Sequence, residues 1–267
     1  MSSTSDQKNE SPFTDPPVKF KVGSSGKVYY VHPGVLLPFS SSALCTRIHG
    51  SWKGTNDDTV DLTDDDEHTI ENVIDFFYTR KYHPAQLLPG LPMVMDYDSL
   101  ESPLETDALE ILAHARVFSF AHIYLISELE SYATERLTKC LAGLEGYYIE
   151  MLPHLAEAIR VIYGTTPNIS QNAARPLLSD FTALKFSTLS GALLDDLMAE
   201  FSDFRVDVLG KLAGRIKDMN LNIIKLEVQC AQLDEELFES KDQVEGWETW
   251  NRSLPLSNQR PEYALYH

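Results

Sequence analysis

Histidines and cysteines are the residues of this chain whose side chains could bind a transition metal or act in catalysis. Two imidazoles bind one metal from positions i and i+4 of a helix, whereas His114 and His122 lie eight residues apart across an expected turn. Cys45, Cys140 and Cys230 lie in apolar or helical contexts, without an adjacent histidine to activate the thiol. The sequence therefore predicts no metal site, no catalytic residue and no cofactor.

The longest run of carboxylates in the chain is Asp64-Asp65-Asp66-Glu67. Clustered carboxylates can bind a hard divalent cation, but this run lacks the alternating ligands and central glycine of an EF-hand loop. It directly precedes an apolar pattern from Ile70 to Phe77 that predicts a helix. We therefore interpret the run as the start of that helix, where the helix dipole stabilises negative charge.

Short motifs of enzymes do not occur in the chain. The patterns GxGxxG, GxxxxGK[ST], GxSxG and HExxH, which position phosphates, a nucleophilic serine or a catalytic zinc, are all missing. An enzyme whose site is assembled from distant residues is the alternative from another functional class. A deep pocket lined by converging polar groups would support that alternative.

Composition excludes several other classes. The formal net charge is −18, from 40 Asp and Glu against 22 Lys and Arg, so we expect no direct binding to nucleic acid. No apolar run reaches the ~18 residues that a membrane helix needs, so no membrane association is expected. The polar segment 1–17 lacks the apolar core of a secretory signal and is predicted to be a disordered tail. Three cysteines without a CxxC pair are typical of a reduced, cytoplasmic or nuclear protein.

Residues 18–141 predict a small sheet flanked by helices. Two β-prone runs, Lys19–Val22 and Lys27–Val31, lie on either side of a Gly/Ser turn and predict a hairpin. A third run, Thr59–Leu62, predicts a strand before the helix at 70–80. Helical periodicity returns at 107–117 and again at 123–141.

The order of these elements resembles the BTB/POZ fold, and most closely the single-BTB proteins that are common in filamentous fungi. The positions that match the signature of the family are His32, Leu36, Ser40, Trp52, Asp64, Asp65, Phe77, Tyr78 and Thr79. The resemblance implies an α+β protein with a BTB/POZ fold, followed by an α-helical extension and a long C-terminal helix. It also implies a domain that binds other proteins and catalyses nothing.

The resemblance carries expectations for single residues. Ser40 falls on a helix-capping serine of the family. The ring of Tyr78 is expected to pack while its hydroxyl finds a polar partner. Ala43 stands where a bulky aromatic residue is usual, so Phe39 or Leu44 is expected to supply the missing core volume.

Some family members are substrate adaptors of a cullin-type ubiquitin ligase, which is the alternative function within the same class. They contact the cullin through an apolar-x-Glu element, and Gly54 replaces that glutamate here. A cullin is therefore a doubtful partner. Members also dimerise through an N-terminal helix, whereas prolines interrupt the polar segment before Val18 in this chain. Self-association is expected elsewhere.

Two further segments surround the end of the predicted domain. Residues 83–106 hold four prolines and four acidic residues, which predicts an insertion without regular helix, either a mobile spacer or a partner-binding loop. Residues 143–207 predict three helices, at 148–164, 173–185 and 189–200, and resemble the helical extension that follows fungal BTB domains.

The clearest periodicity lies in 208–245, a predicted long helix that is followed by a tail at 246–267. Apolar residues alternate at spacings of three and four over four heptads, which favours a coiled coil. We call this set the seam: Leu209, Leu212, Ile216, Met219, Ile223, Leu226, Cys230, Leu233 and Leu237. Either the seam pairs with another chain, such as a second copy, or it packs against its own chain. The sequence as a whole predicts a non-enzymatic adaptor or scaffold whose partners are other proteins.

Overall fold

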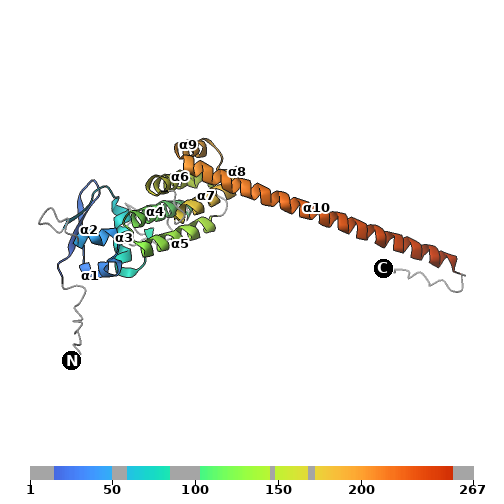
Figure 1. The fold of residues 1–267 in the computed structure, drawn as a ribbon, viewed down its shortest axis with the longest axis horizontal. Coiled ribbons are helices and arrows are strands. Elements are labelled where there is room, and N and C mark those ends of the chain that lie inside the picture. Colours follow the sequence, from blue (N-terminus) through green and yellow to red (C-terminus); the bar gives the residue numbers. More distant parts are fainter. Residues whose placement is uncertain (1–14, 50–58, 85–102, 145–147, 168–171, 255–267) are drawn as a thin grey trace, which may run out of the picture. The chain divides into compact units, whose positions relative to one another are not determined.

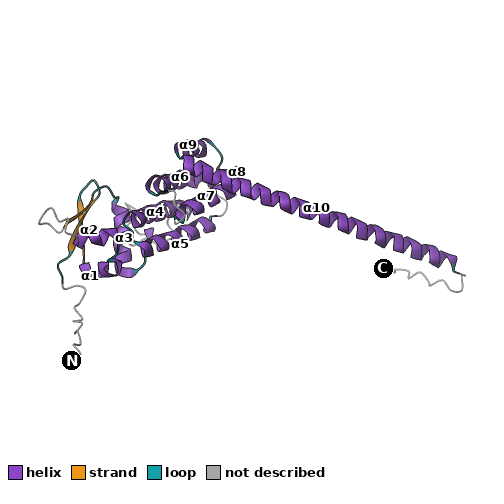
Figure 2. Cartoon of the chain, viewed as in Figure 1, coloured by secondary structure: helices purple, strands orange, loops and turns teal. Residues whose placement is uncertain are grey.

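The computed structural model describes residues 15–49, 59–84, 103–144, 148–167 and 172–254 (Figure 1). These residues form a three-stranded sheet and a larger set of helices, the α+β arrangement that the sequence predicts (Figure 2). The chain divides into two units, residues 1–211 and residues 212–267. Trp52, Gly54, most of the predicted insertion and the chain ends lie outside the described residues.

The sheet has the strand order β2-β1-β3. Strand β1 (Val18–Val22) pairs antiparallel with β2 (Lys27–Val31), with Phe20 opposite Tyr29. It also pairs parallel with β3 (Thr59–Leu62), with Phe20 opposite Val60. Alternate side chains of β1 are buried, which is the period of two that a sheet with one covered face produces. All three predicted strands are confirmed.

The hairpin turn requires glycine at two positions. Gly23 and Gly26 both have φ near +66°, a conformation that side chains with a Cβ rarely adopt. The backbone N–H of Gly26 donates to the carbonyl of Gly23 over 3.0 Å and closes the turn. The Gly/Ser segment therefore forms the tight connection that the sequence predicts.

Short helices connect β2 to β3: α1 (Pro33–Leu36), the 3₁₀ helix η1 (Leu37–Phe39) and α2 (Ala43–His49). The chain then forms α3 (Glu67–Thr79) after the third strand. Phe39 is buried with its ring centroid 5.1 Å from that of Phe77, and Leu44 is fully buried. These two residues supply core volume beside the small Ala43, as expected.

A pair of long helices, α4 (Pro103–Ile123) and α5 (Ser127–Gly143), completes the region predicted as a BTB domain. The predicted boundary of the insertion is wrong at its end, because 103–106 belong to α4 and not to a segment without helix. A proline at the first position of a helix has no N–H that the helix would have used, and its fixed φ suits a helix start. Pro103 therefore begins a helix and does not prevent one.

The helical extension contains α6 (Tyr148–Thr165), α7 (Ala174–Leu184), α8 (Phe186–Leu189) and α9 (Ala192–Glu200). Helix α6 packs along α4, which is also in contact with α5 (Figure 1). The helix predicted at 189–200 is in fact two elements, because Gly191 has φ +158° and separates α8 from α9.

The last helix, α10 (Ser202–Ser253), has 52 residues and is therefore about 78 Å long. Its predicted bounds of 208 and 245 are wrong at both ends. The helix begins six residues earlier, where Phe204 and Val208 are fully buried in the first unit. It also continues through Gly246, because one interior glycine costs only about 1 kcal/mol relative to alanine. The predicted tail at 246–267 is thus helical up to Ser253.

Candidate functional site

Two residues of the predicted BTB signature are brought together where β2 meets α1. The backbone N–H of His32 donates to the Tyr78 hydroxyl over 3.1 Å, and His32 Nδ1 lies 2.7 Å from the same oxygen. The two rings meet edge to face. The hydroxyl of Tyr78 therefore has the polar partner that the sequence predicts, and the pair connects the end of α3 to the strand-to-helix junction.

Other signature residues have local structural roles. Leu36 and Phe77 are buried in the core. Thr79 accepts a hydrogen bond from the backbone N–H of Lys81 over 3.2 Å and so closes the end of α3. Ser40 is exposed, and the capping role predicted for it belongs to Ser42, whose Oγ accepts from the N–H of Cys45 over 3.2 Å. The cap lies at Ser42 because α2 begins at residue 43.

The acidic run lies at the start of α3, as predicted. Asp66 is the N-cap, and its carboxylate accepts from the backbone N–H groups of His68 and Thr69 over 3.1 and 3.2 Å. Burial, together with the adjacent charges of Asp64 and Asp66, raises the pKa of Asp65 to about 6. The run therefore caps the start of α3, and Asp65 within it lies in an environment that disfavours its ionised form.

Asp65→Asn is expected to stabilise the protein at pH 7 by about 1 kcal/mol, a value reduced for the partial exposure of this carboxyl. The pKa of Asp65 is higher in the folded state (about 6) than its ordinary value of 3.8, so the fold favours the protonated form. The stability that the protonated Asp65 contributes is fully present below pH 3.8 and is lost as the pH rises through about 6. Thermal unfolding should therefore show a gain of about 2–4 °C at pH 7 that disappears near pH 4.

The control is Asp75→Asn, on an exposed position of α3, which should change stability by less than about 0.5 kcal/mol at either pH. Equal gains from the two variants, or a gain for Asp65→Asn that persists at pH 4, would contradict the assignment.

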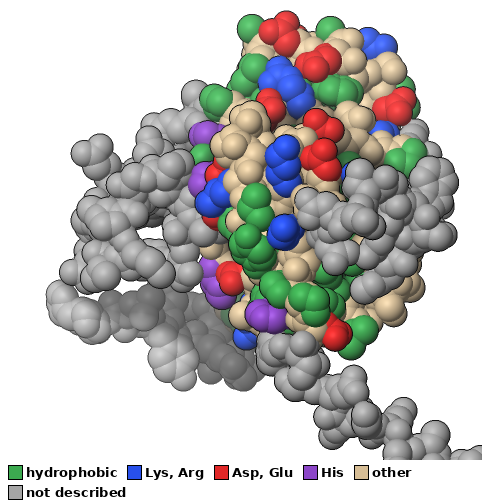
Figure 3. Space-filling model, turned by 90° about the vertical axis from the view of Figure 1, so that its left-hand side faces the viewer, with side chains coloured by type: hydrophobic (Ala, Val, Ile, Leu, Met, Phe, Trp, Pro, Cys, Tyr) green, Lys and Arg blue, Asp and Glu red, His purple; other side chains and the backbone are tan. Residues whose placement is uncertain are grey.

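The sheet ends in an exposed edge strand. Strand β2 is last in the strand order, and Val28 and Tyr30, which lie on one face of it, are 44% and 60% exposed. On the face of the protein in Figure 3, hydrophobic side chains gather near the centre, while basic and acidic side chains are interspersed around them. Exposed apolar groups at a sheet edge are typical of surfaces that bind protein.

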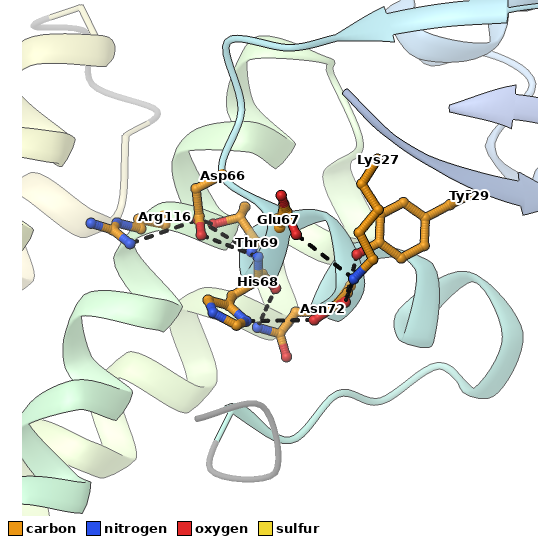
Figure 4. A network of polar contacts seen from close by, with 9 residues as sticks. Lys27, Tyr29, Asp66, Glu67, His68, Thr69, Asn72 and Arg116 are labelled. Carbon is orange, nitrogen blue, oxygen red and sulfur yellow. Dashed lines mark hydrogen bonds and ion pairs between the residues drawn. The ribbon is translucent and has the colours of Figure 1, made fainter. Parts of the chain in front are cut away.

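A polar network connects the hairpin to α3 (Figure 4). Glu71 accepts from Lys27 Nζ over 2.9 Å and from the Tyr29 hydroxyl over 2.5 Å. Burial opposes ionisation of Glu71, but the hydrogen bonds from Tyr29 and Lys27 lower its pKa. Burial and the bond to Glu71 raise the pKa of Tyr29 to about 12. Because these hydrogen bonds join Lys27 and Tyr29 of β2 to Glu71 of α3, the network fixes the position of β2.

A partly buried polar cluster lies between α4 and α5. His114 is fully buried, and its Nδ1 lies 2.8 Å from the hydroxyl of Tyr82. Its Nε2 has no hydrogen-bond partner among the described residues and lies 4.0 Å from Oε2 of Glu110. Cys140 Sγ donates to the same carboxylate oxygen over 3.5 Å. We call Glu110, His114 and Cys140 the α4–α5 cluster.

Burial and the nearby positive charge of Arg136 lower the pKa of His114 to about 3. The imidazole is therefore neutral at physiological pH. The turn predicted between His114 and His122 is wrong, because both residues lie on α4, which continues to Ile123. His122 lies 3.2 Å from Glu130, whereas His114 lies with Glu110 and Cys140.

Part of this cluster has a sequence signal that was missed. Glu110 and His114 have the i, i+4 spacing that places two side chains on one face of a helix. Cys140 lies on the next helix, and its approach to the pair depends on how α4 and α5 pack. Among the described residues, this is the group whose side chains could hold a metal ion.

The seam is exposed. Seven of its nine residues, all except Leu212 and Cys230, are 50–63% exposed, and Cys230 is also exposed. Every residue from 213 to 250 is exposed. The described part of the unit 212–267 consists of α10 alone, so none of its described residues belongs to a second element that covers these side chains.

Comparison of the chain with models of protein families, with curated proteins and with solved structures gives no match. Among the described helices, none combines the length and apolar character that crossing a bilayer requires.

Proposed function

We propose that this chain is a non-enzymatic scaffold, which associates with itself through α10 and presents its α+β unit to other proteins. The observation that carries the proposal is the exposed apolar seam of α10. Soluble proteins rarely leave a long apolar stripe in water, and an isolated helix gains most of its stability by packing such a stripe. A partner helix is the element that a seam with heptad spacing fits.

The structure extends the seam by one heptad. Val244 follows Leu237 by one heptad and Trp247 follows Leu233 by two. Both lie on α10, and both are more than half exposed. Ser240 is the one polar residue in the a and d positions between Leu209 and Trp247. The apolar surface therefore continues almost to the end of the helix, which favours pairing over its full length.

The charge distribution of α10 supports a second, antiparallel copy as the occupant. From Leu212 to Leu226 the helix has three basic residues and one acidic residue, a net charge of +2. From Glu227 to Ser253 it has two basic and eight acidic residues, a net charge of −6. Antiparallel pairing of 212–253 places the basic stretch 212–226 along 239–253, which has two basic and four acidic residues, whereas parallel pairing places each of these stretches along its own like charge. The acidic stretch 227–238 lies along itself in both arrangements, so the two ends of the helix decide the preference.

The other side of α10 carries a shorter apolar stripe: Leu221, Ile224, Val228 and Phe238 are all about half exposed or more. A two-helix pair that uses the seam leaves this stripe uncovered. Two antiparallel pairs could pack through it, because the stripe lies in the central part of the helix. We therefore propose an antiparallel dimer as the basic unit and a tetramer of two such dimers as the larger assembly.

The α+β unit is proposed to be a BTB/POZ domain that binds other proteins. Support comes from the order of its elements: a hairpin, short helices, a strand parallel to the first, then α3 and the pair α4 and α5. The exposed edge of β2 is the surface that we propose for binding. A cytoplasmic or nuclear location is proposed because none of the three cysteines forms a disulfide.

Spin-label distances test both the association and its direction. Asp218 lies at heptad position c, away from the seam, and would carry the label as Asp218→Cys in a chain with Cys140→Ser and Cys230→Ala. Alanine at position 230 removes the thiol without placing a polar group in the seam. Antiparallel pairing of 212–253 places the two labelled positions about 40–45 Å apart along the axis. Parallel pairing places them about 20 Å apart or less. A short distance would overturn the antiparallel arrangement, and no intermolecular distance would overturn the self-association.

A further inference from the structure

The α4–α5 cluster has the composition of a zinc site. Imidazole nitrogen, thiolate sulfur and carboxylate oxygen are the ligands that Zn²⁺ takes in proteins, and a thiolate favours zinc over harder cations. The three candidate ligand atoms all lie within 4.8 Å of one another. The side chain of His114 is 0% exposed and that of Glu110 is 20% exposed, so the cluster is buried on one side and open to solvent on the other.

The distances between the ligand atoms suit a tetrahedral ion. Ordinary zinc bond lengths place such ligand atoms about 3.4–3.6 Å apart. Cys140 Sγ and Glu110 Oε2 are already 3.5 Å apart, and His114 Nε2 is 4.0 Å from the same oxygen. Closing the cluster on an ion thus needs movements of about 1 Å, which rotations of the Glu110 and Cys140 side chains can supply.

His114 is the decisive residue, because its Nε2 is buried and no described residue forms a hydrogen bond with it. An unsatisfied buried polar atom is costly, and each one in a folded protein needs an explanation. The hydroxyl of Tyr82 lies 2.8 Å from Nδ1 of His114, where its oxygen can accept a hydrogen bond from Nδ1–H. In that tautomer Nε2 keeps its lone pair, which is then available to a metal ion. Metal-bound histidines are oriented by a hydrogen-bond partner on the other nitrogen in this way.

We propose that Glu110, His114 and Cys140 bind one Zn²⁺ ion, which joins α4 to α5, with water as the fourth ligand on the exposed side. The ion would fix the C-terminal part of α5, which carries Cys140, against the middle of α4. This role is independent of the self-association through α10, which uses other residues.

A nucleophilic thiol is the competing interpretation of the same residues. In a cysteine–histidine pair, the thiol gives its proton to the imidazole. Here the thiol of Cys140 donates to Oε2 of Glu110, and the same carboxylate oxygen lies 4.0 Å from His114 Nε2. The arrangement joins three ligands around a common point and does not form a proton-transfer pair.

One charge opposes the ion. Arg136 lies one turn before Cys140 on α5, and its positive charge contributes to lowering the pKa of His114. Its buried Nε has no hydrogen-bond partner among the described residues. Loss of one thiol proton on binding changes the charge of the cluster from −1 to 0, so a nearby cation disfavours the bound state. Arg136→Gln is therefore expected to tighten zinc binding, an effect that an ordinary polar cluster would not show.

The test uses the full-length protein after dialysis against a chelator. Addition of Co²⁺ as a spectroscopic substitute should give thiolate-to-metal charge-transfer absorption that saturates at one equivalent. Addition of Zn²⁺ at about 100 times its dissociation constant should raise the Tm by roughly 5–10 °C. Cys140→Ser should abolish the charge-transfer band. Tyr82→Phe should weaken binding roughly 10–100-fold, as loss of an outer partner of a metal-bound histidine does.

Cys230→Ser is the matched control, because this thiol lies on α10 and is not one of the three residues of the cluster, so it should contribute nothing to the band. Circular dichroism establishes that each variant is folded, and tighter binding by Arg136→Gln provides a test that does not depend on a ligand deletion. Absence of the band in the wild-type protein would overturn the proposal, and so would a band that survives Cys140→Ser or is lost with Cys230→Ser.

Discussion

Ile223→Asp combined with Leu226→Asp is expected to convert the self-associated protein into a monomer. The two residues are adjacent a and d positions of the seam, and both are at least half exposed in the single chain. Pairing would bury them, and a buried unpaired carboxylate is strongly unfavourable. Two carboxylates from each copy would thus enter the same apolar interface. The dissociation constant is expected to rise by more than about 100-fold, since the loss exceeds roughly 3 kcal/mol.

Sedimentation velocity at tens of micromolar measures this change. The matched control is Gln232→Asp with Thr249→Asp, which adds the same charge at heptad positions c and f and should leave association intact. The Tm of the α+β unit should be unchanged in both variants, because none of these residues lies in the first unit. A wild-type protein that sediments as a monomer would sink the proposed pairing.

Arg175→Ala is expected to destabilise the first unit by about 3–5 kcal/mol, the usual effect of deleting one partner of a buried charge network. The guanidinium is 5% exposed at the junction of α6, α7 and α10. It donates to the carbonyl of Tyr163 over 3.2 Å and to the carbonyl of Thr166. It also forms an ion pair with Asp203 at 3.2 Å and lies 4.5 Å from the centre of the Tyr163 ring.

Alanine would leave these buried carbonyl groups without a donor and would open a cavity beside Tyr163. The Tm should fall by at least about 6 °C, because 1 kcal/mol corresponds to roughly 2–4 °C in a unit of this size. Asp203 lies in the first turn of α10, so the start of that helix should also become less protected from hydrogen exchange.

The comparison variant is Arg160→Ala. Arg160 forms ion pairs with Glu157 and Glu200 at 3.4 and 3.0 Å, but these carboxylates are more than 40% exposed. Exposed pairs contribute about 0–1 kcal/mol, so a much smaller fall in Tm is expected. Similar losses for the two arginines would mean that Arg175 does not hold the junction in the way its contacts indicate.

The sequence by itself determined the elements whose patterns are local. Alternation around Gly23–Gly26 predicts the hairpin, since both the strand period and the positive φ of the turn depend on neighbouring residues. The acidic run predicts the start of α3 for the same reason, because a cap acts within one turn. The spacing of the seam predicts a long helix, and only its ends were misplaced, at Ser202 and Ser253.

The tertiary structure decided which distant residues meet. Glu110 and His114 share a helix face, but the packing of α5 on α4 brings Cys140 to them, and no local pattern encodes that packing. Arg175 likewise resembles any arginine on an amphipathic helix until Tyr163 and Asp203 surround it. Local hydrogen bonding and periodicity can be read along the chain, whereas burial of a polar group depends on contacts between elements that are far apart in the sequence.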